Sequence, residues 1–111
     1  MSATNNKKDV FNRLEEMIHS IHPRIEKRHS ERYQSFSEFV YDSTPFVMLK
    51  EQRNFVGIYL CDPMPYMNKR QEELARPFST GKGCIRVKSR EEIEEHADKI
   101  LEILKEQKNK I

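Results

Sequence analysis

Apolar residues recur at helical spacing near both ends of the chain. Between residues 7 and 22 they are Val10, Leu14, Met17, Ile18 and Ile21, and the same intervals repeat later in Ile93, Ala97, Ile100, Leu101 and Leu104. Residues spaced by three and four positions lie on one side of an α-helix and form a stripe that packs on a core. The pattern therefore predicts two amphipathic helices, one over residues 7–22 and one from residue 90 to about 105–108.

Short signals mark the ends of these helices. Asn6 is a suitable N-cap for the first helix, and Pro23 ends it because the residue before a proline disfavours helical geometry. Ser89 and Glu92 have the spacing of a capping box, in which the serine side chain bonds forward and the glutamate side chain bonds back to the cap. The stretch 68–75 predicts a short helix capped by Asn68.

The middle of the chain changes to short runs rich in Phe, Val, Tyr, Leu and Ile, which favour strands. These runs predict four strands, over residues 38–44, 45–50, 54–61 and 84–88. We predict a hairpin turn at 51–53, an end to the sheet at the prolines of 62–65, and a loop over 79–83. Residues 24–37 are charged and polar, and the pattern does not decide between helix and loop there.

Together these elements predict a single α+β domain. Its antiparallel sheet carries the N- and C-terminal helices on one face, because each helix has one apolar stripe to bury. The domain is expected to span residues 7–108, with residues 1–6 as a flexible N-terminal tail. The 111 residues suffice for one hydrophobic core and are too few for two domains.

Composition and charge exclude several classes of protein. The chain has 20 Lys and Arg against 18 Asp and Glu, so its net charge of +2 does not by itself require a nucleic-acid partner. No apolar run approaches the ~18 residues of a membrane span. Two cysteines, Cys61 and Cys84, cannot form the disulfide framework of a small secreted domain, and no signal-peptide pattern opens the sequence. We therefore expect a cytoplasmic protein with two free thiols.

Three short motifs resemble the YdhG-like family. They are Asn54-Phe55-Val56-Gly57-Ile58-Tyr59, Gln71-Glu72-Glu73-Leu74-Ala75 and Thr80-Gly81-Lys82-Gly83-Cys84-Ile85, and the stretch 41–46 is similar to the family's tyrosine-to-phenylalanine strand pair. The similarity extends over residues 10–104. It implies a frataxin-like fold and, for some members, the role of an intracellular iron chaperone. Such a protein would donate iron to an iron–sulfur scaffold or to ferrochelatase.

The first helix carries candidate metal ligands in Glu15, Glu16 and His19. Residues three and four positions apart are neighbours on a helix surface, and carboxylate together with imidazole suits ferrous iron. We predict that this set lies on the exposed side of the helix and binds Fe(2+) weakly, with water completing the coordination. The resemblance adds that frataxin-like proteins are thought to use this helix. The alternative is an exposed helix face on which the Glu–His pairs only stabilise the helix slightly.

A second candidate site is a basic surface on the sheet. Arg53, Lys82, Arg86 and Lys88 could form it, with Tyr59 as a stacking surface for a nucleic acid. An acidic protein is a second partner for the same surface. The alternative interpretation is a set of charged residues on an ordinary solvated sheet face.

Two weaker signals add further hypotheses. The stretch Gly81-Lys82-Gly83 could bind an anion through its backbone N–H groups, or could simply form a turn into the last strand. Cys61 and Cys84 would suit a soft metal if they were adjacent, or they could fill ordinary strand positions.

The residues do not point to an enzyme, because no nucleophile with a base and no carboxylate pair stands in a recognisable setting. The first functional hypothesis is a non-enzymatic carrier or adaptor that binds iron transiently and docks on a partner protein. The second is a binding module that uses the basic sheet surface for a nucleic acid or an acidic protein. Salt-dependent nucleic-acid binding would favour the second hypothesis, and ferrous iron binding by the first helix would favour the first.

Overall fold

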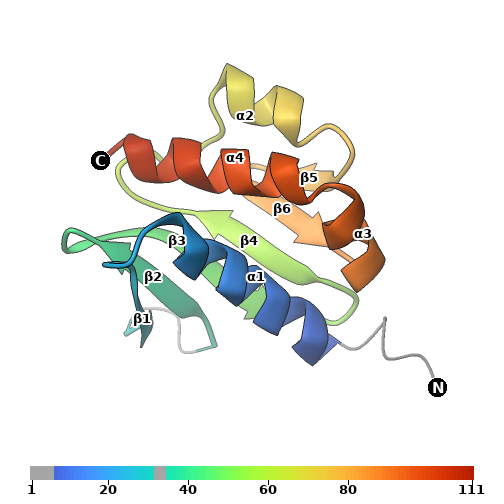
Figure 1. Cartoon of the computed structure of the whole chain (residues 1–111), viewed down its shortest axis with the longest axis horizontal. Coiled ribbons are helices and arrows are strands. Elements are labelled where there is room, and N and C mark those ends of the chain that lie inside the picture. Colours follow the sequence, from blue (N-terminus) through green and yellow to red (C-terminus); the bar gives the residue numbers. More distant parts are fainter. Residues whose placement is uncertain (1–6, 32–34) are drawn as a thin grey trace.

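The computed structural model describes residues 7–31 and 35–111, which adopt an α+β fold. A six-stranded antiparallel sheet carries α1 (Lys7–Ile21) and α4 (Ala97–Asn109) on one face, as Figure 1 shows. The predicted fold class is therefore confirmed. The Asn6 cap and the tail predicted over residues 1–6 lie outside the described residues.

Every pair of neighbouring strands in the sheet is antiparallel. Across the sheet the strands follow the order β1 (Glu26–His29), β2 (Ser37–Tyr41), β3 (Thr44–Glu51), β4 (Val56–Leu60), β6 (Cys84–Val87) and β5 (Ser79–Gly81). The helix α2 (Lys69–Leu74) connects β4 to β5 and lies beside α4 (Figure 1). The edges of the sheet are thus formed by β1 and β5, which have four and three residues.

Both terminal helices bury an apolar stripe against the sheet. In α1 the buried residues are Val10, Leu14, Met17 and Ile18, as predicted, and Ile21 is partly buried. The apolar residues buried by α4 are Ile100, Ile103 and Leu104. Beneath the helices β4 contributes Val56, Ile58 and Leu60 to the same core. Burying one such side chain contributes about 1.5–3 kcal/mol of hydrophobic free energy, so this layer stabilises the fold.

The C-terminal segment contains two helices, so the single helix predicted from residue 90 onward is wrong. The helix α3 (Arg90–Glu95) ends at His96, whose φ of −124° and ψ of 28° depart from helical geometry. The His96 ring packs edge-on against Phe78, with 5.4 Å between the ring centroids. With this break, α4 buries Ile103 to 1% exposure, whereas Leu101, which the spacing placed in the core stripe, is only partly buried.

The predicted caps of the short helices are confirmed in part. Asn68 and Gln71 form a reciprocal capping box at the start of α2. At α3 the Ser89 hydroxyl accepts a hydrogen bond from the Glu92 N–H at 3.1 Å, as predicted. The Glu92 carboxylate, however, accepts from the Lys88 N–H at 2.8 Å, so the predicted bond back to the cap is wrong by one position. This bond ties the end of β6 to the helix that follows.

The strand predictions hold for the centre of the sheet and fail at its edges. The strands β3, β4 and β6 coincide closely with the predicted runs 45–50, 54–61 and 84–88. The predicted strands 38–44 and 45–50 left no turn between them. In the structure a turn at Asp42 and Ser43, whose φ angles are 52° and 66°, separates β2 from β3. The edge strand β1 falls in the undecided stretch, and β5 falls in the predicted loop over 79–83. The turn into β6 at Lys82 and Gly83 agrees with the prediction.

Candidate functional site

The open face is the side of β3, β4 and β6 that is turned away from α1 and α4. Gly57 and Tyr59 lie on it, because they alternate with the β4 residues that pack beneath the helices. The strand register adds four residues in two rows: Lys50 and Arg86 beside Gly57, and Met48 and Cys84 beside Tyr59. The centre of this face therefore combines cations, an aromatic ring and a thiol.

Five cations, which we call the basic track, follow the direction of β4. They are Lys50, Arg53, Lys82, Arg86 and Lys88, and among residues 7–31 and 35–111 none of them forms an ion pair with a carboxylate. Arg53 and Lys88 adjoin one end of β4, and Lys82 lies in the turn at the other end. Since a strand rises ~3.3 Å per residue, the track extends over roughly 17 Å.

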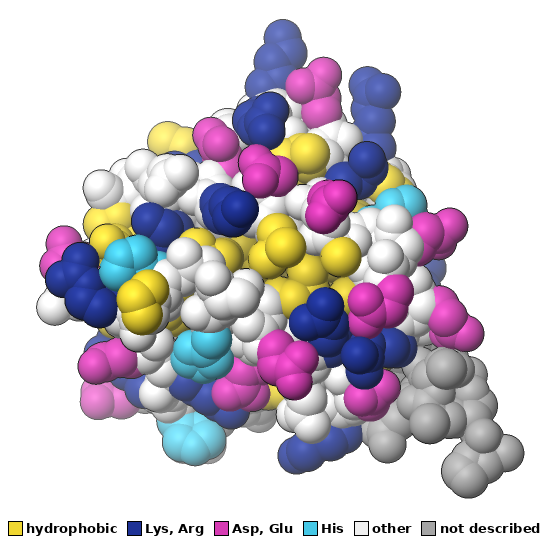
Figure 2. Space-filling model, in the orientation of Figure 1, with side chains coloured by type: hydrophobic (Ala, Val, Ile, Leu, Met, Phe, Trp, Pro, Cys, Tyr) yellow, Lys and Arg dark blue, Asp and Glu magenta, His cyan; other side chains and the backbone are white. Residues whose placement is uncertain are grey.

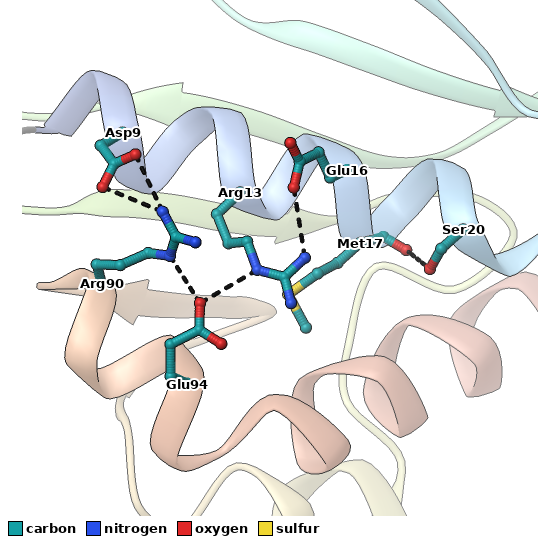
Figure 3. Close-up of polar contacts among 7 residues, drawn as sticks. All are labelled: Asp9, Arg13, Glu16, Met17, Ser20, Arg90 and Glu94. Atoms are coloured by element: carbon teal, nitrogen blue, oxygen red, sulfur yellow. Dashed lines mark hydrogen bonds and ion pairs between the residues drawn. The ribbon is translucent and has the colours of Figure 1, made fainter.

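The side of the molecule that carries α1, α3 and α4 differs from the open face. There Lys and Arg side chains lie among Asp and Glu side chains (Figure 2). Arg90 contacts Asp9 at 3.0 Å and Glu94 at 2.6 Å, and Arg13 contacts Glu94 at 3.2 Å and Glu16 at 3.4 Å. Figure 3 shows that this network joins α1 to α3. The positive charges of these arginines are thereby balanced within the chain.

Aromatic rings lie beside the cations of the open face in place of carboxylates. From the cationic atom to the ring centroid, the pairs are Lys50 with Phe36 at 5.2 Å, Lys82 with Tyr66 at 5.3 Å, and Arg86 with Phe55 at 5.8 Å. Such contacts contribute ~0.5–1 kcal/mol at exposed sites and leave the charge unneutralised. The rings therefore orient the cations while their charge remains able to attract an anion.

The Tyr59 ring lies over Gly57. A Cβ atom at Gly57 would stand 2.7 Å from Tyr59 Cζ, which is closer than real Cβ atoms approach other heavy atoms. The Tyr59 hydroxyl accepts a hydrogen bond from Gln52 Nε2 at 2.8 Å, and the Phe36 ring meets the Tyr59 ring edge-on at 5.1 Å. The missing side chain at Gly57 thus lets the tyrosine lie along the strand and not stand away from the sheet.

Arg86 is held in a similar way on the neighbouring strands. Its Nη1 donates a hydrogen bond to Ser79 Oγ at 3.2 Å. A Cβ atom at Gly81 would stand 2.9 Å from Arg86 Nη2, so the guanidinium lies across β5 where a larger residue would displace it. Two glycines therefore leave room for the two central side chains of the open face.

A groove of about 420 Å³ opens beside Tyr59. Its lining includes Met48 and Tyr59 from the sheet, Phe36 from just before β2, and Pro65, Tyr66 and Lys82 from the connecting segments. The volume is within the range of about 300–1,000 Å³ that small-ligand sites occupy. An apolar, aromatic lining with one lysine suits a flat ligand group that is attached to a negative charge.

The outer wall of this groove is fixed to α4. Gln107, which is fully buried, donates from Nε2 to the carbonyl oxygens of Cys61 and Met64, each at 3.0 Å. Lys110 Nζ donates to the Tyr66 carbonyl oxygen at 2.9 Å. The segment that carries Tyr66 is therefore held in place by the C-terminal helix.

Burial shifts the titration of the groups at the centre of the open face. It raises the pKa of Tyr59, against a smaller lowering by the hydrogen bond from Gln52. It also raises the pKa of the Cys84 thiol, with the Arg86 charge acting in the opposite direction. Phenol and thiol are thus both uncharged at neutral pH, and the charge of this region comes from the cations.

Cys61 and Cys84 are free thiols, as predicted. Burial, together with the charges of Glu38 and Asp62, raises the pKa of Cys61 to about 12. Because the thiolate is the reactive form, the raised pKa keeps both cysteines in the less reactive protonated form at neutral pH.

The residues predicted to bind iron belong to two separate ion-pair groups. Glu15 lies 3.8 Å from His19 Nε2 and 3.1 Å from Lys27 Nζ, whereas Glu16 contacts Arg13 at 3.4 Å. In the described part of the chain, no three His, Cys, Asp or Glu side chains gather as a metal-binding group. The iron site stays a prediction. Glu15, Glu16 and His19 line one open pocket on α1, and within it Glu15 lies 3.8 Å from His19 Nε2.

The residues predicted for a partner surface fall into two sets. Tyr59 and Lys82 line the same groove and Arg86 lies in the adjoining row, whereas Arg53 and Lys88 adjoin the strand ends. Sequence reasoning missed Lys50 and the rings of Phe36, Phe55 and Tyr66, which reach the site across strands and loops. A glycine two positions before a strand tyrosine was the one local signal for a ring that lies flat.

No helix among the described residues combines the length and the apolar character needed to cross a bilayer. Comparisons of the chain with protein-family models, with curated proteins and with solved structures returned no match. The YdhG-like resemblance therefore stays a prediction.

Proposed function

We propose that this chain is a nucleic-acid-binding module whose ligand lies along the open face of the sheet. The observation that carries the proposal is the basic track, whose five cations have no carboxylate partner among the described residues. A chain of phosphates would neutralise these charges without displacing an internal carboxylate. Binding of this kind releases counterions and weakens as salt rises.

The length of the basic track supports a polymer over a small anion. Arg53 and Lys88 at one end and Lys82 at the other are separated by the whole of β4. One strand of a duplex carries one phosphate per ~3.4 Å of helix axis, so a track of this length matches the axial span of about five phosphates. A single small anion would contact only one part of it.

The aromatic rings favour nucleic acid over an acidic protein. Phe36, Tyr59 and Tyr66 all line the groove that Lys82 borders. Flat rings interleaved with cations can stack on bases while the cations contact phosphates. The carboxylates of an acidic protein would use the cations and leave the rings without a matching group.

The iron-carrier hypothesis remains a prediction for the opposite side of the molecule. Before binding iron, Glu15 would have to leave Lys27 and Glu16 would have to leave Arg13. Competition from these cations favours weak and reversible binding. Under this hypothesis the partners would be an iron–sulfur scaffold or ferrochelatase, as the resemblance implies.

Fluorescence anisotropy with a labelled single strand of about twelve nucleotides tests the proposal at several salt concentrations. The variant Lys82→Gln/Lys88→Gln removes two exposed cations of the basic track. The control Lys99→Gln/Lys105→Gln makes the same charge change on exposed residues of α4. We expect the first variant to weaken binding and to reduce the slope of log affinity against log salt by roughly 1.4, because each phosphate contact contributes ~0.7. The control should match the wild type.

Two outcomes would contradict the proposal. One is wild-type protein that shows no salt-dependent binding to the oligonucleotide. The other is an equal loss of affinity in both double variants, which would indicate attraction by overall charge and not by the open face. Binding of a poly-glutamate peptide in preference to the oligonucleotide would instead assign the face to an acidic protein.

A further inference from the structure

We propose that the groove beside Tyr59 holds one unpaired nucleobase, so that the open face binds single-stranded nucleic acid in preference to duplex. This inference rests on the proposed function, which assigns the open face to a nucleic acid without distinguishing single strand from duplex. It adds the part of the ligand that the groove recognises.

The groove has the composition of a stacking site. Phe36, Tyr59 and Tyr66 supply three rings, Met48 adds an apolar contact, and Lys82 stands at the rim. A nucleobase is a flat ring joined through a sugar to a phosphate. Its ring matches the aromatic lining, and its phosphate matches Lys82 at the rim.

The Tyr59 ring is in position before a ligand arrives. It occupies the space above Gly57, and its hydroxyl is held by Gln52 at 2.8 Å. Groups that are already ordered lose less conformational entropy on binding. Tyr59 is therefore suited to serve as the fixed stacking surface of the groove.

Tyr66 forms a more accessible part of the groove lining. Its side chain belongs to a residue that is 51% exposed, and Lys82 Nζ lies 5.3 Å from its ring centroid. The backbone at this position is anchored by Lys110, which donates to the Tyr66 carbonyl at 2.9 Å. The ring can thus contact a ligand while the segment that carries it stays in place.

An unpaired base fits this arrangement and a paired base does not. In a duplex both faces of each base are covered by neighbouring bases, so a base must leave the stack to reach a groove. In a single strand the base faces are accessible to aromatic side chains, and such stacking tolerates any base. We therefore expect preference for single strands with little dependence on base identity.

Four variants separate the stacking contribution from the electrostatic one. Tyr59→Leu removes the ring, Tyr59→Phe keeps it, Gly57→Ala displaces it without changing any charge, and Tyr66→Leu removes the exposed ring. Tyr41→Leu is the matched control, because Tyr41 is a partly buried strand tyrosine that does not line this groove. Affinity is measured by anisotropy for the same oligonucleotide as a single strand and as a duplex.

Tyr59→Leu should lower single-strand affinity about tenfold or more, and Tyr59→Phe should keep it within about twofold. Gly57→Ala and Tyr66→Leu should each lower the single-strand affinity several-fold, while Tyr41→Leu should leave it near the wild-type value. The affinity for the duplex should stay near the wild-type value in every variant. Circular dichroism checks folding, and if the variants of β4 unfold, Tyr66→Leu decides because its side chain is exposed.

Unchanged single-strand affinity in the ring variants, while Lys82→Gln/Lys88→Gln still weakens binding, would overturn this inference and leave the proposed function standing. Equal wild-type affinity for single strand and duplex would overturn it as well. If wild-type protein binds neither form, both proposals fail.

Discussion

Charged side chains of α1 and α3 pair with one another, whereas Lys50, Lys82 and Arg86 on the open face lie beside aromatic rings. On the same side of the sheet as the open face, the neighbouring strands β1 and β2 carry the ion pair of Arg28 with Glu38. The network of Arg90, Asp9 and Glu94 balances charge between two helices. Lys82 and Arg86 instead contact Tyr66 and Phe55. The same residue types thus join elements of the fold on one side and remain able to attract an anion on the other.

The two faces also differ in how β4 uses its alternating residues. Toward the helices it presents Val56, Ile58 and Leu60, which fill the core. Toward the open face it presents Gly57 and Tyr59, a small residue next to a large ring that lies over it. The alternating residues of β4 therefore fill a densely packed core on one side and shape an exposed surface on the other.

The largest effect on stability is expected in the core between the sheet and the helices α1 and α4. Replacing Leu14 or Ile103 with alanine should lower the free energy of unfolding by ~2–5 kcal/mol, because both side chains are fully buried and leave a cavity. Leu101→Ala should cost less, because Leu101 is only partly buried. Urea denaturation measures all three, and an equal loss at Leu101 and Ile103 would show that α4 is rotated relative to this account.

The thiol of Cys61 provides the second test, because it lies beside the open face and is nevertheless shielded. Its pKa is raised from 9.0 to about 12, so its contribution to stability is full below pH 9 and is lost as pH rises toward 12. Wild type should therefore lose more stability than Cys61→Ala over this interval. Thiol titration at pH 8 should be slow in the folded protein and rapid in urea. Rapid reaction of both thiols without urea would contradict the account.

The smallest effect on stability is expected from the surface charges, and here the two faces should diverge. Asp9→Asn should cause a small loss of stability that vanishes at high salt, because exposed ion pairs are screened. Lys82→Gln/Lys88→Gln should cost no more than the ~0.5–1 kcal/mol of the Lys82–Tyr66 contact. Neither lysine has a carboxylate partner among the described residues. Urea denaturation at low and high salt compares them, and a larger loss in the lysine variant would show that its charges support the fold.

Elements with a strong hydrophobic period could be predicted from sequence, and elements without one could not. The apolar residues of α1 recur at helical spacing along its whole length, so the helix could be predicted. The strand β1, by contrast, has the sequence Glu26-Lys27-Arg28-His29 and is exposed throughout, so it shows no alternation of apolar and polar residues. The turn at Asp42 and Ser43 lacks the glycine that usually marks positive φ. The break at His96 was hidden because the apolar spacing continues across it.

The candidate site was predictable only where its residues share a strand or a turn. Tyr59 and Arg86 follow from alternation in β4 and β6, and Lys82 follows from the turn between glycines. Phe36 and Tyr66 reach the groove from other parts of the chain, so their contribution depends on tertiary packing that no local pattern encodes. The paired state of Glu15 and Glu16 depends in the same way on Lys27 and Arg13.

Which of the two faces contacts the ligand can be measured residue by residue. In an NMR titration of ¹⁵N-labelled protein with a single-stranded oligonucleotide, changes in amide chemical shift should concentrate on β3, β4, β6 and the turn at Lys82 and Gly83. These changes should diminish as salt is added, because salt weakens the binding. Amides on the outer sides of α1 and α4 should remain unchanged. Shifts centred on α1, or spread evenly over both faces, would contradict the claim that the open face is the binding surface.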